Sequence, residues 1–317
     1  MHPAYSVIIF TTASGAGYGL LIGLAAAILL GLVPRDPVFG FFALGTALAL
    51  ITIGLLTSTL HLGRPARAWR AVSQVGTSWL SREGVAALVT YLPAAALGFG
   101  WVFGETVPDQ IVIGAVSSII GSVITVWCTG KIYSTLPTIR AWNQRLVTPV
   151  YVMLALVTGG VLLNFFLIAF GYSFYWTAAV MALLLALGCD MKMRYWSKID
   201  SADRTYTAEA ATGLGYLGTV RPLDPPHTQP NYVMREMGYQ VARRHARKLR
   251  QLAIALLFVL PLLCIAALLL LNLPQALSIT VAALSVCSAA AGVFVERWLF
   301  FAEAEHVVVV FYRGGAA

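Results

Sequence analysis

The stretch LIGLAAAILLGLV, residues 21–33, decides the fold class of this chain. It carries no charged residue, and its apolar residues do not alternate with polar ones as they do in the strands of a membrane β-barrel. A helix needs about 20 apolar residues to cross a bilayer. The run that contains this stretch extends back to about residue 6, so it predicts a membrane-spanning helix.

Seven more runs of similar character follow along the 317 residues. With 59% hydrophobic and only 11% charged residues, the composition excludes an ordinary soluble protein. We predict an all-α, polytopic membrane protein that forms one integral-membrane domain, residues 1–317, with a long cytoplasmic loop at 196–249. The eight predicted spans cover residues 6–33, 37–61, 84–104, 109–136, 147–171, 174–195, 250–272 and 275–301.

Positive charges are distributed unevenly between the two sides of this predicted bundle. Eight spans place both termini on one side, together with the loops after the second, fourth and sixth spans. Every Lys and Arg except Arg35 falls on that side. The positive-inside rule then places both termini and the long loops in the cytoplasm. The net charge of +8 therefore reflects membrane topology and requires no nucleic-acid partner.

The sequence offers no residues for a metal-based redox centre of its own. Of the five histidines, only His61 lies near membrane depth, so we expect no haem with two histidine ligands. Iron–sulfur clusters need closely spaced thiolates, and no C-x-x-C pair is present, so we expect no such cluster and no metal site. The cysteines are expected to be small, buried side chains: Cys128, Cys189, Cys264 and Cys287.

Transport across the membrane is a minor alternative. Charged residues inside membrane spans mark ion and proton pathways, but the predicted span cores contain almost none, and Lys131, Asp190 and Glu296 fall near cytoplasmic ends. Asn164, near the middle of the fifth span, is expected to form a hydrogen bond between helices.

The first span carries two patterns of small and polar residues. Gly15, Gly19 and Gly23 recur at intervals of four and predict close packing against another helix. Thr12 and Tyr18 lie toward the cytoplasmic end of the span. Such hydroxyls either bond back to their own helix or line a polar pocket near that membrane surface.

The second span ends on STLHLGRPARAWR, residues 58–70, with His61 where the apolar run stops. Gly63 and Pro65 are expected to break the helix. The segment TSWLSREG, residues 77–84, then predicts Ser81 as the N-cap of the third span, with Glu83 in its first turn.

An interfacial belt of Trp and Arg explains part of this segment, but the combination of imidazole, guanidinium and carboxylate offers more chemistry. A quinone head group lies at this depth, and its reduction takes up two protons. His61 titrates near neutrality, Glu83 can relay protons, and an arginine can donate a hydrogen bond to a carbonyl oxygen.

The segment HLGRPARAWRAVSQVGTSWLSREG, residues 61–84, resembles the membrane anchor subunits of the dimethyl sulfoxide reductase family, which carry H-L-G-x-P-x-R followed by S-W-L-S-R-E. The opening MHPAYSVIIFTT, the eight spans and the loop with RPLDPPHTQPNYVMREMGYQVARRHA extend this resemblance over most of the sequence. The resemblance implies an anchor that binds quinone, ubiquinone or menaquinone, and holds no metal. Motif positions implied to act in proton exchange are His61 and Glu83. The full set of expected quinone-binding residues is His61, Gly63, Arg67, Trp69, Ser78, Glu83, Thr12 and Tyr18.

The resemblance also implies partner subunits in a bacterial inner membrane. In such complexes a molybdopterin catalytic subunit and a four-cluster, ferredoxin-like iron–sulfur subunit exchange electrons with the anchor, which has no catalytic activity alone. The cytoplasmic basic residues are candidates for docking these subunits, although a juxtamembrane basic patch also suits anionic lipids. The candidates are Arg64, Arg70, Arg140, Arg243, Arg244 and Arg247.

The family contains both directions of electron flow. Dimethyl sulfoxide reductases take electrons from menaquinol, whereas membrane-bound sulfite dehydrogenases of the cytoplasmic type give electrons to quinone. The predicted cytoplasmic face favours sulfite oxidation coupled to quinone reduction, with the menaquinol-oxidising reductase as the alternative. A purely structural anchor without a quinone site also remains open.

Overall fold

The computed structural model describes residues 3–60, 65–104, 108–172, 174–201, 207–221, 223–224 and 241–311. Within these ranges the protein is helical and contains no strand, only one isolated bridge between Ile139 and His306. The long helices are α1 (Tyr5–Leu29), α2 (Pro37–Thr59), α3 (Trp79–Val102), α4 (Pro108–Ser134), α5 (Val147–Ala169), α6 (Tyr175–Ser201), α9 (Val241–Ile254), α10 (Leu260–Leu270) and α11 (Gln275–Ala302). Shorter elements are η1 (Pro65–Val72), α7 (Ala208–Thr212), η2 (Gly215–Leu217), η3 (Ala255–Val259) and η4 (Val307–Phe311).

Eight helical segments in the described ranges are long and apolar enough to cross a membrane, with α9, η3 and α10 together forming the seventh. This confirms the predicted all-α protein with eight span-forming helices. Several helices run past the predicted apolar runs: α3 begins at Trp79, α6 ends at Ser201 and α9 begins at Val241. The helical backbone continues into polar sequence there, where hydropathy gives no signal.

The third span begins earlier than the capping pattern predicts. Ser78 is the N-cap, and its hydroxyl accepts a hydrogen bond from the Ser81 amide at 3.4 Å. The Ser81 hydroxyl instead donates to the Ala71 carbonyl and accepts from the Gln74 amide. The predicted N-cap at Ser81 is therefore wrong, and Glu83 lies in the second helical turn because a tertiary contact uses the hydroxyl that was expected to cap the helix.

Helices α1 and α5 cross at close range in the centre of the bundle. A Cβ added at Gly19 would lie 1.8 Å from the Ala155 carbonyl oxygen, and one at Gly159 would lie 2.1 Å from backbone atoms of α1. This confirms the predicted glycine ridge at Gly19, since only hydrogen fits between the two backbones. The close contact fixes the relative position of α1, which carries Thr12, and α5, which carries Tyr151.

Asn164 forms the predicted hydrogen bond between helices. Thr177 of α6 donates a hydrogen bond to Asn164 Oδ1 of α5 at 2.9 Å, and both side chains are buried.

The cysteines were predicted to be buried, and this is correct for Cys128 and Cys264 only. Cys189 is half-buried and Cys287 is exposed on α11, so the prediction is wrong for Cys287. A span of a membrane protein has a lipid-facing surface that composition alone does not separate from its buried face.

The seventh span contains one π-helical turn, η3, directly before Pro261. Proline has no amide hydrogen to donate and its ring crowds the preceding turn, so the wider turn relieves the clash. The Ser288 hydroxyl of α11 donates to the Leu256 carbonyl in this turn at 2.6 Å. Gly292 allows α11 to pack directly on the same backbone.

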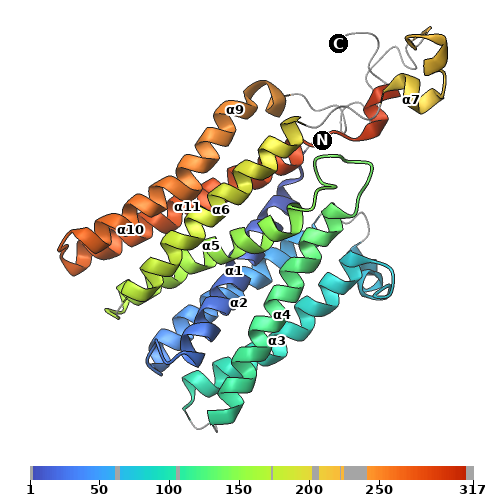
Figure 1. The fold of residues 1–317 in the computed structure, drawn as a ribbon. Helices are drawn as coiled ribbons and strands as arrows, with labels where there is room; N and C mark the ends of the chain where they lie inside the picture. Colours follow the sequence, from blue (N-terminus) through green and yellow to red (C-terminus); the bar gives the residue numbers. More distant parts are fainter. Residues whose placement is uncertain are drawn as a thin grey trace.

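Figure 1 shows that α1 begins and α11 ends at the same end of the bundle, where the connections after α2, α4 and α6 also lie. We call this the terminal end. The opposite end carries the short connections between α1 and α2, α5 and α6, and α10 and α11. Polar side chains from several helices gather toward the terminal end, and the candidate site is among them.

Candidate functional site

The connection between α2 and α3 folds back on the start of α3. Besides the two contacts of Ser81, the Arg82 guanidinium donates hydrogen bonds to the carbonyls of Val75 at 2.8 Å and Gly76 at 2.6 Å. The same guanidinium stacks on Trp79, 4.4 Å from the ring centroid. Arg82 therefore fixes the loop that leads from the basic η1 into the helix that carries Glu83.

Glu83 is the buried acid of this region, with only 3% of its surface exposed. Glu83 lies in the second turn of α3 and faces α4. The Thr129 hydroxyl of α4 donates a hydrogen bond to Glu83 Oε1. Within the described residues no cation forms an ion pair with this carboxylate. A buried carboxyl held only by a neutral donor can change its protonation state without breaking a salt bridge.

Tyr18 of α1 lies in the same region. Its side chain is buried beside the Thr125 side chain, and its hydroxyl makes no hydrogen bond of standard geometry within the described part of the protein. It lies within electrostatic range of Glu83. An unpartnered buried hydroxyl is costly, so this phenol is a donor that suits a ligand carbonyl or a water molecule.

A small cavity connects this region with the centre of the bundle. Its volume is about 10 Å³, close to the room that one buried water molecule needs. Residues of α1, α4, α5 and α11 line it, among them Thr12, Thr129, Tyr151 and Arg297. The Thr12 hydroxyl donates to the Ile8 carbonyl of its own helix at 2.8 Å, which leaves its oxygen as an acceptor.

Of the predicted site residues, Tyr18 lies within electrostatic range of Glu83, and Thr12 lines the cavity together with Thr129, the donor to Glu83. Arg67 and Trp69 are exposed on η1, and Ser78 caps α3. The predicted proton donor His61 and the neighbouring Gly63 lie outside the described residues.

The predicted docking residues have different environments. Arg70 is exposed and its guanidinium lies 5.6 Å from the Trp69 ring centroid. Arg247 is exposed on α9. The Arg140 guanidinium donates to the Ile199 carbonyl at 3.1 Å, which ties the connection after α4 to the end of α6. Arg64 and the side chains of Arg243 and Arg244 lie outside the described part of the structure.

Sequence reasoning missed a second buried charged cluster. Lys192 of α6 forms an ion pair with Glu296 of α11, and Arg297 lies beside them. All three side chains are inside the bundle, although Glu296 was expected only near a cytoplasmic helix end. Their positions inside predicted apolar runs were the available signal, because charged residues rarely occur there unless they face the protein interior.

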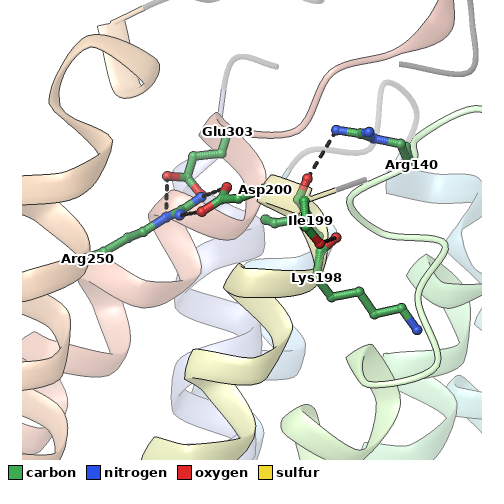
Figure 2. A network of polar contacts seen from close by, with 7 residues as sticks. Arg140, Lys198, Ile199, Asp200, Arg250 and Glu303 are labelled. Atoms are coloured by element: carbon green, nitrogen blue, oxygen red, sulfur yellow. Dashed lines mark hydrogen bonds and ion pairs between the residues drawn. The ribbon is translucent and has the colours of Figure 1, made fainter. Parts of the chain in front are cut away.

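A separate network of charged side chains, centred on Arg250, lies at the terminal end. Arg250 of α9 bonds Asp200 of α6 at 2.6 Å and Glu303, just after α11, at 3.0 Å (Figure 2). Burial raises the pKa of Glu303, and Arg250 opposes part of that effect. One guanidinium thereby joins the ends of three helices near the buried cluster.

Comparison with known proteins identifies relatives over the whole sequence. The family model described as DMSO reductase anchor subunit (DmsC) matches residues 1–303. The C subunit of the sulfite dehydrogenase of Allochromatium vinosum is 29% identical over an alignment that spans 100% of both proteins. The C chain of the anaerobic dimethyl sulfoxide reductase of Escherichia coli is 29% identical over 52% of the present protein and 58% of the relative. Its counterpart in the anaerobic dimethyl sulfoxide reductase of Haemophilus influenzae is 30% identical over 38% of the present protein and 43% of the relative.

Proposed function

This protein belongs to the family of DMSO reductase anchor subunits, and from that premise we propose that it is the quinone-reactive membrane anchor of a molybdopterin and iron–sulfur oxidoreductase. In the proposed complex the anchor exchanges electrons between an iron–sulfur subunit and the quinone pool. Sulfite oxidation is the proposed source of these electrons, since the sulfite dehydrogenase relative from Allochromatium vinosum is similar along its full length.

The observation that carries this proposal is the environment of Glu83. It is a buried carboxyl near the terminal end, bound by the neutral Thr129 hydroxyl and close to the unpartnered Tyr18 hydroxyl. A quinone carbonyl needs hydrogen-bond donors, and its reduction consumes protons. A carboxyl that exchanges protons beside a free phenol donor suits both requirements.

The proposed roles follow from the chemistry of each side chain. Bound quinone supplies the two-electron acceptor chemistry. Glu83 and His61 hold and release the protons, Tyr18 and Arg67 donate hydrogen bonds that orient the head group, and Trp69 contributes an apolar surface. Gly63, Ser78 and Thr12 shape the pocket, Ser78 by fixing the start of α3.

The proposed orientation places the terminal end in the cytoplasm of a bacterial inner membrane. Nearly all Lys and Arg residues fall at that end, as the positive-inside rule requires of short cytoplasmic loops. The iron–sulfur subunit is proposed to dock on this face, with the molybdopterin subunit bound to it. Exposed Arg70 and Arg247 are available for this contact, whereas Arg140 also holds the connection after α4 in place. Arg64, Arg243 and Arg244, whose side chains lie outside the described part, are proposed to contribute on the basis of the sequence.

Quinone-linked turnover of the purified complex tests the proposal. Wild type and a His61→Ala variant are compared with sulfite as donor, and dye-linked sulfite oxidation serves as the control for the molybdopterin subunit. We expect sulfite to reduce quinone in wild type, and the variant to lose this activity while dye-linked oxidation persists. If instead quinol drives dimethyl sulfoxide reduction and sulfite is inert, the direction is reversed. Normal quinone-linked turnover in the His61→Ala variant would make His61 an interfacial residue only, and normal turnover after replacement of Glu83 as well would support a purely structural anchor.

A further inference from the structure

The buried cluster of Lys192, Glu296 and Arg297 has no role in the function proposed above. Their side chains are 1%, 0% and 2% exposed. Lys192 Nζ pairs with Glu296 Oε1, and Arg297 Nη1 lies 3.5 Å from Glu296 Oε2. Removing such charges from water is costly, and pairing them offsets only part of that cost. Buried charges in membrane spans therefore point first to a function rather than to stability.

Aromatic and polar groups from every neighbouring helix enclose this cluster. Lys192 Nζ lies 4.2 Å from the Tyr195 ring centroid, and the Arg297 guanidinium lies 3.6 Å from that of Tyr151 on α5. The charged groups of the Arg250 network, reached from α9 and the end of α11, complete the surroundings. The cluster is shielded from lipid, yet polar groups flank it on two sides.

On its inner side the cluster reaches the cavity next to Glu83. Arg297 and Tyr151 line this cavity together with Thr129, which donates to Glu83. Within the described part of the protein, Arg297 Nε and the Tyr151 hydroxyl have no hydrogen-bond partner. One water molecule fits the cavity and finds the two or more polar partners that a buried water needs.

On its outer side the cluster approaches the network of Figure 2. Side-chain exposure falls from 59% at Asp200 to 18% at Arg250 and 9% at Glu303. The cluster and this network meet at Trp196, whose ring centroid lies 4.8 Å from Lys192 Nζ and 5.3 Å from the Arg250 guanidinium carbon. Polar groups therefore extend stepwise from the surface of the terminal end to the buried pair.

We propose that these groups form a proton route from water at the terminal end to Glu83. Protons pass along the carboxylates, Lys192 and water, while Arg250 and Arg297 keep their protons and hold these groups in place. The order is Asp200, Glu303, Lys192 with Glu296, the cavity water beside Arg297, and Thr129 with Glu83. This inference rests on the proposed function, since Glu83 is its inner end.

The route supplies the protons that quinone reduction consumes. One quinone takes up two electrons and two protons to give one quinol. The iron–sulfur subunit of the proposed complex supplies the electrons, and water at the terminal end supplies the protons. Glu83 gives up a proton at the site and is reprotonated through the route, so no proton is drawn from the opposite end of the bundle.

Glu296→Gln tests the route, because it keeps the side-chain size and removes the proton-accepting carboxylate. In the purified complex, with sulfite as donor and a pH-sensitive dye in the solvent, we expect proton uptake and quinone reduction to slow about tenfold or more. The solvent isotope effect in D₂O should rise, while dye-linked sulfite oxidation stays unchanged. Thr177→Val is the matched control, since it removes a buried bond between helices away from the cavity.

A double variant separates proton transfer from stability. Glu296→Gln alone leaves Lys192 without its carboxylate, whereas Lys192→Met with Glu296→Gln removes both charges of the pair. The proposal expects the double variant to regain stability and to remain slow in proton uptake. Recovery of normal uptake would overturn the proposal and leave the pair a structural role.

Infrared spectroscopy gives a readout that needs no quinone turnover. In pH-difference spectra of the resting complex, we expect the carboxylate band of Glu296 to shift as the carboxyls of the terminal-end network titrate, and this difference band to be absent in Glu296→Gln. A spectrum identical in wild type and variant would overturn the route. If wild type fails to reduce quinone at all, the proposed function fails; if wild type is active and Glu296→Gln is equally fast, only the route fails.

Discussion

Two buried carboxyls have opposite surroundings: Glu83, in the second turn of α3, and Glu296, six residues before the end of α11. Glu83 is bound by one neutral hydroxyl, that of Thr129. Glu296 has two cations beside it, Lys192 and Arg297. Both are nearly inaccessible to solvent, so the difference lies in the partners and not in burial.

The partners determine what each carboxyl can do. Cations stabilise the charged form of Glu296, and loss of its charge would leave a buried Lys192 unpaired. Thr129 can donate to Glu83 in either protonation state, because the second oxygen of the carboxyl carries the exchangeable proton. We therefore assign proton exchange with the ligand to Glu83, and the maintenance of a charged relay to Glu296.

The largest expected effect follows from removing the Glu83 carboxyl. In a Glu83→Gln complex we expect quinone-linked turnover to fall by about 10² to 10⁴, the range for loss of a general acid or base. The unfolding midpoint should change little, because no ion pair is broken. Turnover with quinone and with dye, measured side by side, checks both statements. Thr90→Val is the control on the same buried face of α3, and a quinone-linked rate near wild type in Glu83→Gln would contradict the assignment.

In contrast to Glu83→Gln, Lys192→Met should have a large effect on stability. It leaves the Glu296 carboxylate buried without its closest cation, so we expect the free energy of unfolding to fall by about 3–5 kcal/mol. Thermal unfolding of the purified anchor complex in detergent measures this change. Adding Glu296→Gln should restore much of the loss, and a double variant no more stable than Lys192→Met would show that the pair itself is not the cause.

The sequence indicates Glu83 as a site residue, but it indicates neither the hydrogen-bond partner of Glu83 nor the buried pair of Lys192 and Glu296. Glu83 was marked by its place in the S-W-L-S-R-E segment and by the cluster of polar residues before it. Its partner Thr129 is 46 residues away on α4, and nothing local indicates that pairing. Helix packing decides it, so a single sequence does not reveal it.

The Lys192–Glu296 pair was missed for a different reason. Long apolar runs predicted the spans well, but a hydropathy window tolerates one charge, and Glu296 was interpreted as an interfacial residue. Whether a charge six residues from a helix end faces water or another helix depends on the neighbouring helices. The capping error at Ser81 has the same origin, since a tertiary bond to Ala71 outweighed the local pattern.

A smaller effect is expected from the hydroxyl that holds Glu83. Thr129→Val keeps the shape of the side chain and removes the donor, so the carboxyl loses its hydrogen bond in the described structure. We expect a loss of about 1–3 kcal/mol in stability and a moderate fall in quinone-linked turnover. Thr90→Val again serves as the control, because within the described residues its hydroxyl donates to the Ala86 carbonyl of its own helix at 2.7 Å and not to a carboxylate. If Thr129→Val and Thr90→Val lose the same stability and the same quinone-linked turnover, the hydrogen bond from Thr129 to Glu83 has no particular role.

The smallest expected effect comes from a half-buried counterpart of the Glu83–Thr129 contact at the opposite end of the bundle. The Tyr172 hydroxyl donates to Asp36 Oδ2 at 2.5 Å, and this bond lowers the pKa of Asp36 below 3.8 and raises that of Tyr172 to about 12. The lowered carboxyl pKa stabilises the fold above about 3.8, an effect lost as pH falls through the folded value. The raised phenol pKa stabilises it below 10.0, an effect lost as pH rises toward 12.

Tyr172→Phe removes this half-buried hydrogen bond and keeps the ring. Because solvent screens the contact, the substitution should lower the unfolding midpoint only slightly near neutral pH, and the difference from wild type should vanish at both extremes of pH. Thermal unfolding of the two proteins across the pH range measures this difference. A difference that stayed constant with pH would show that the lost hydroxyl acts through packing. The half-buried pair would then no longer support the argument that full burial gives the hydroxyl–carboxyl contact at Glu83 its greater weight.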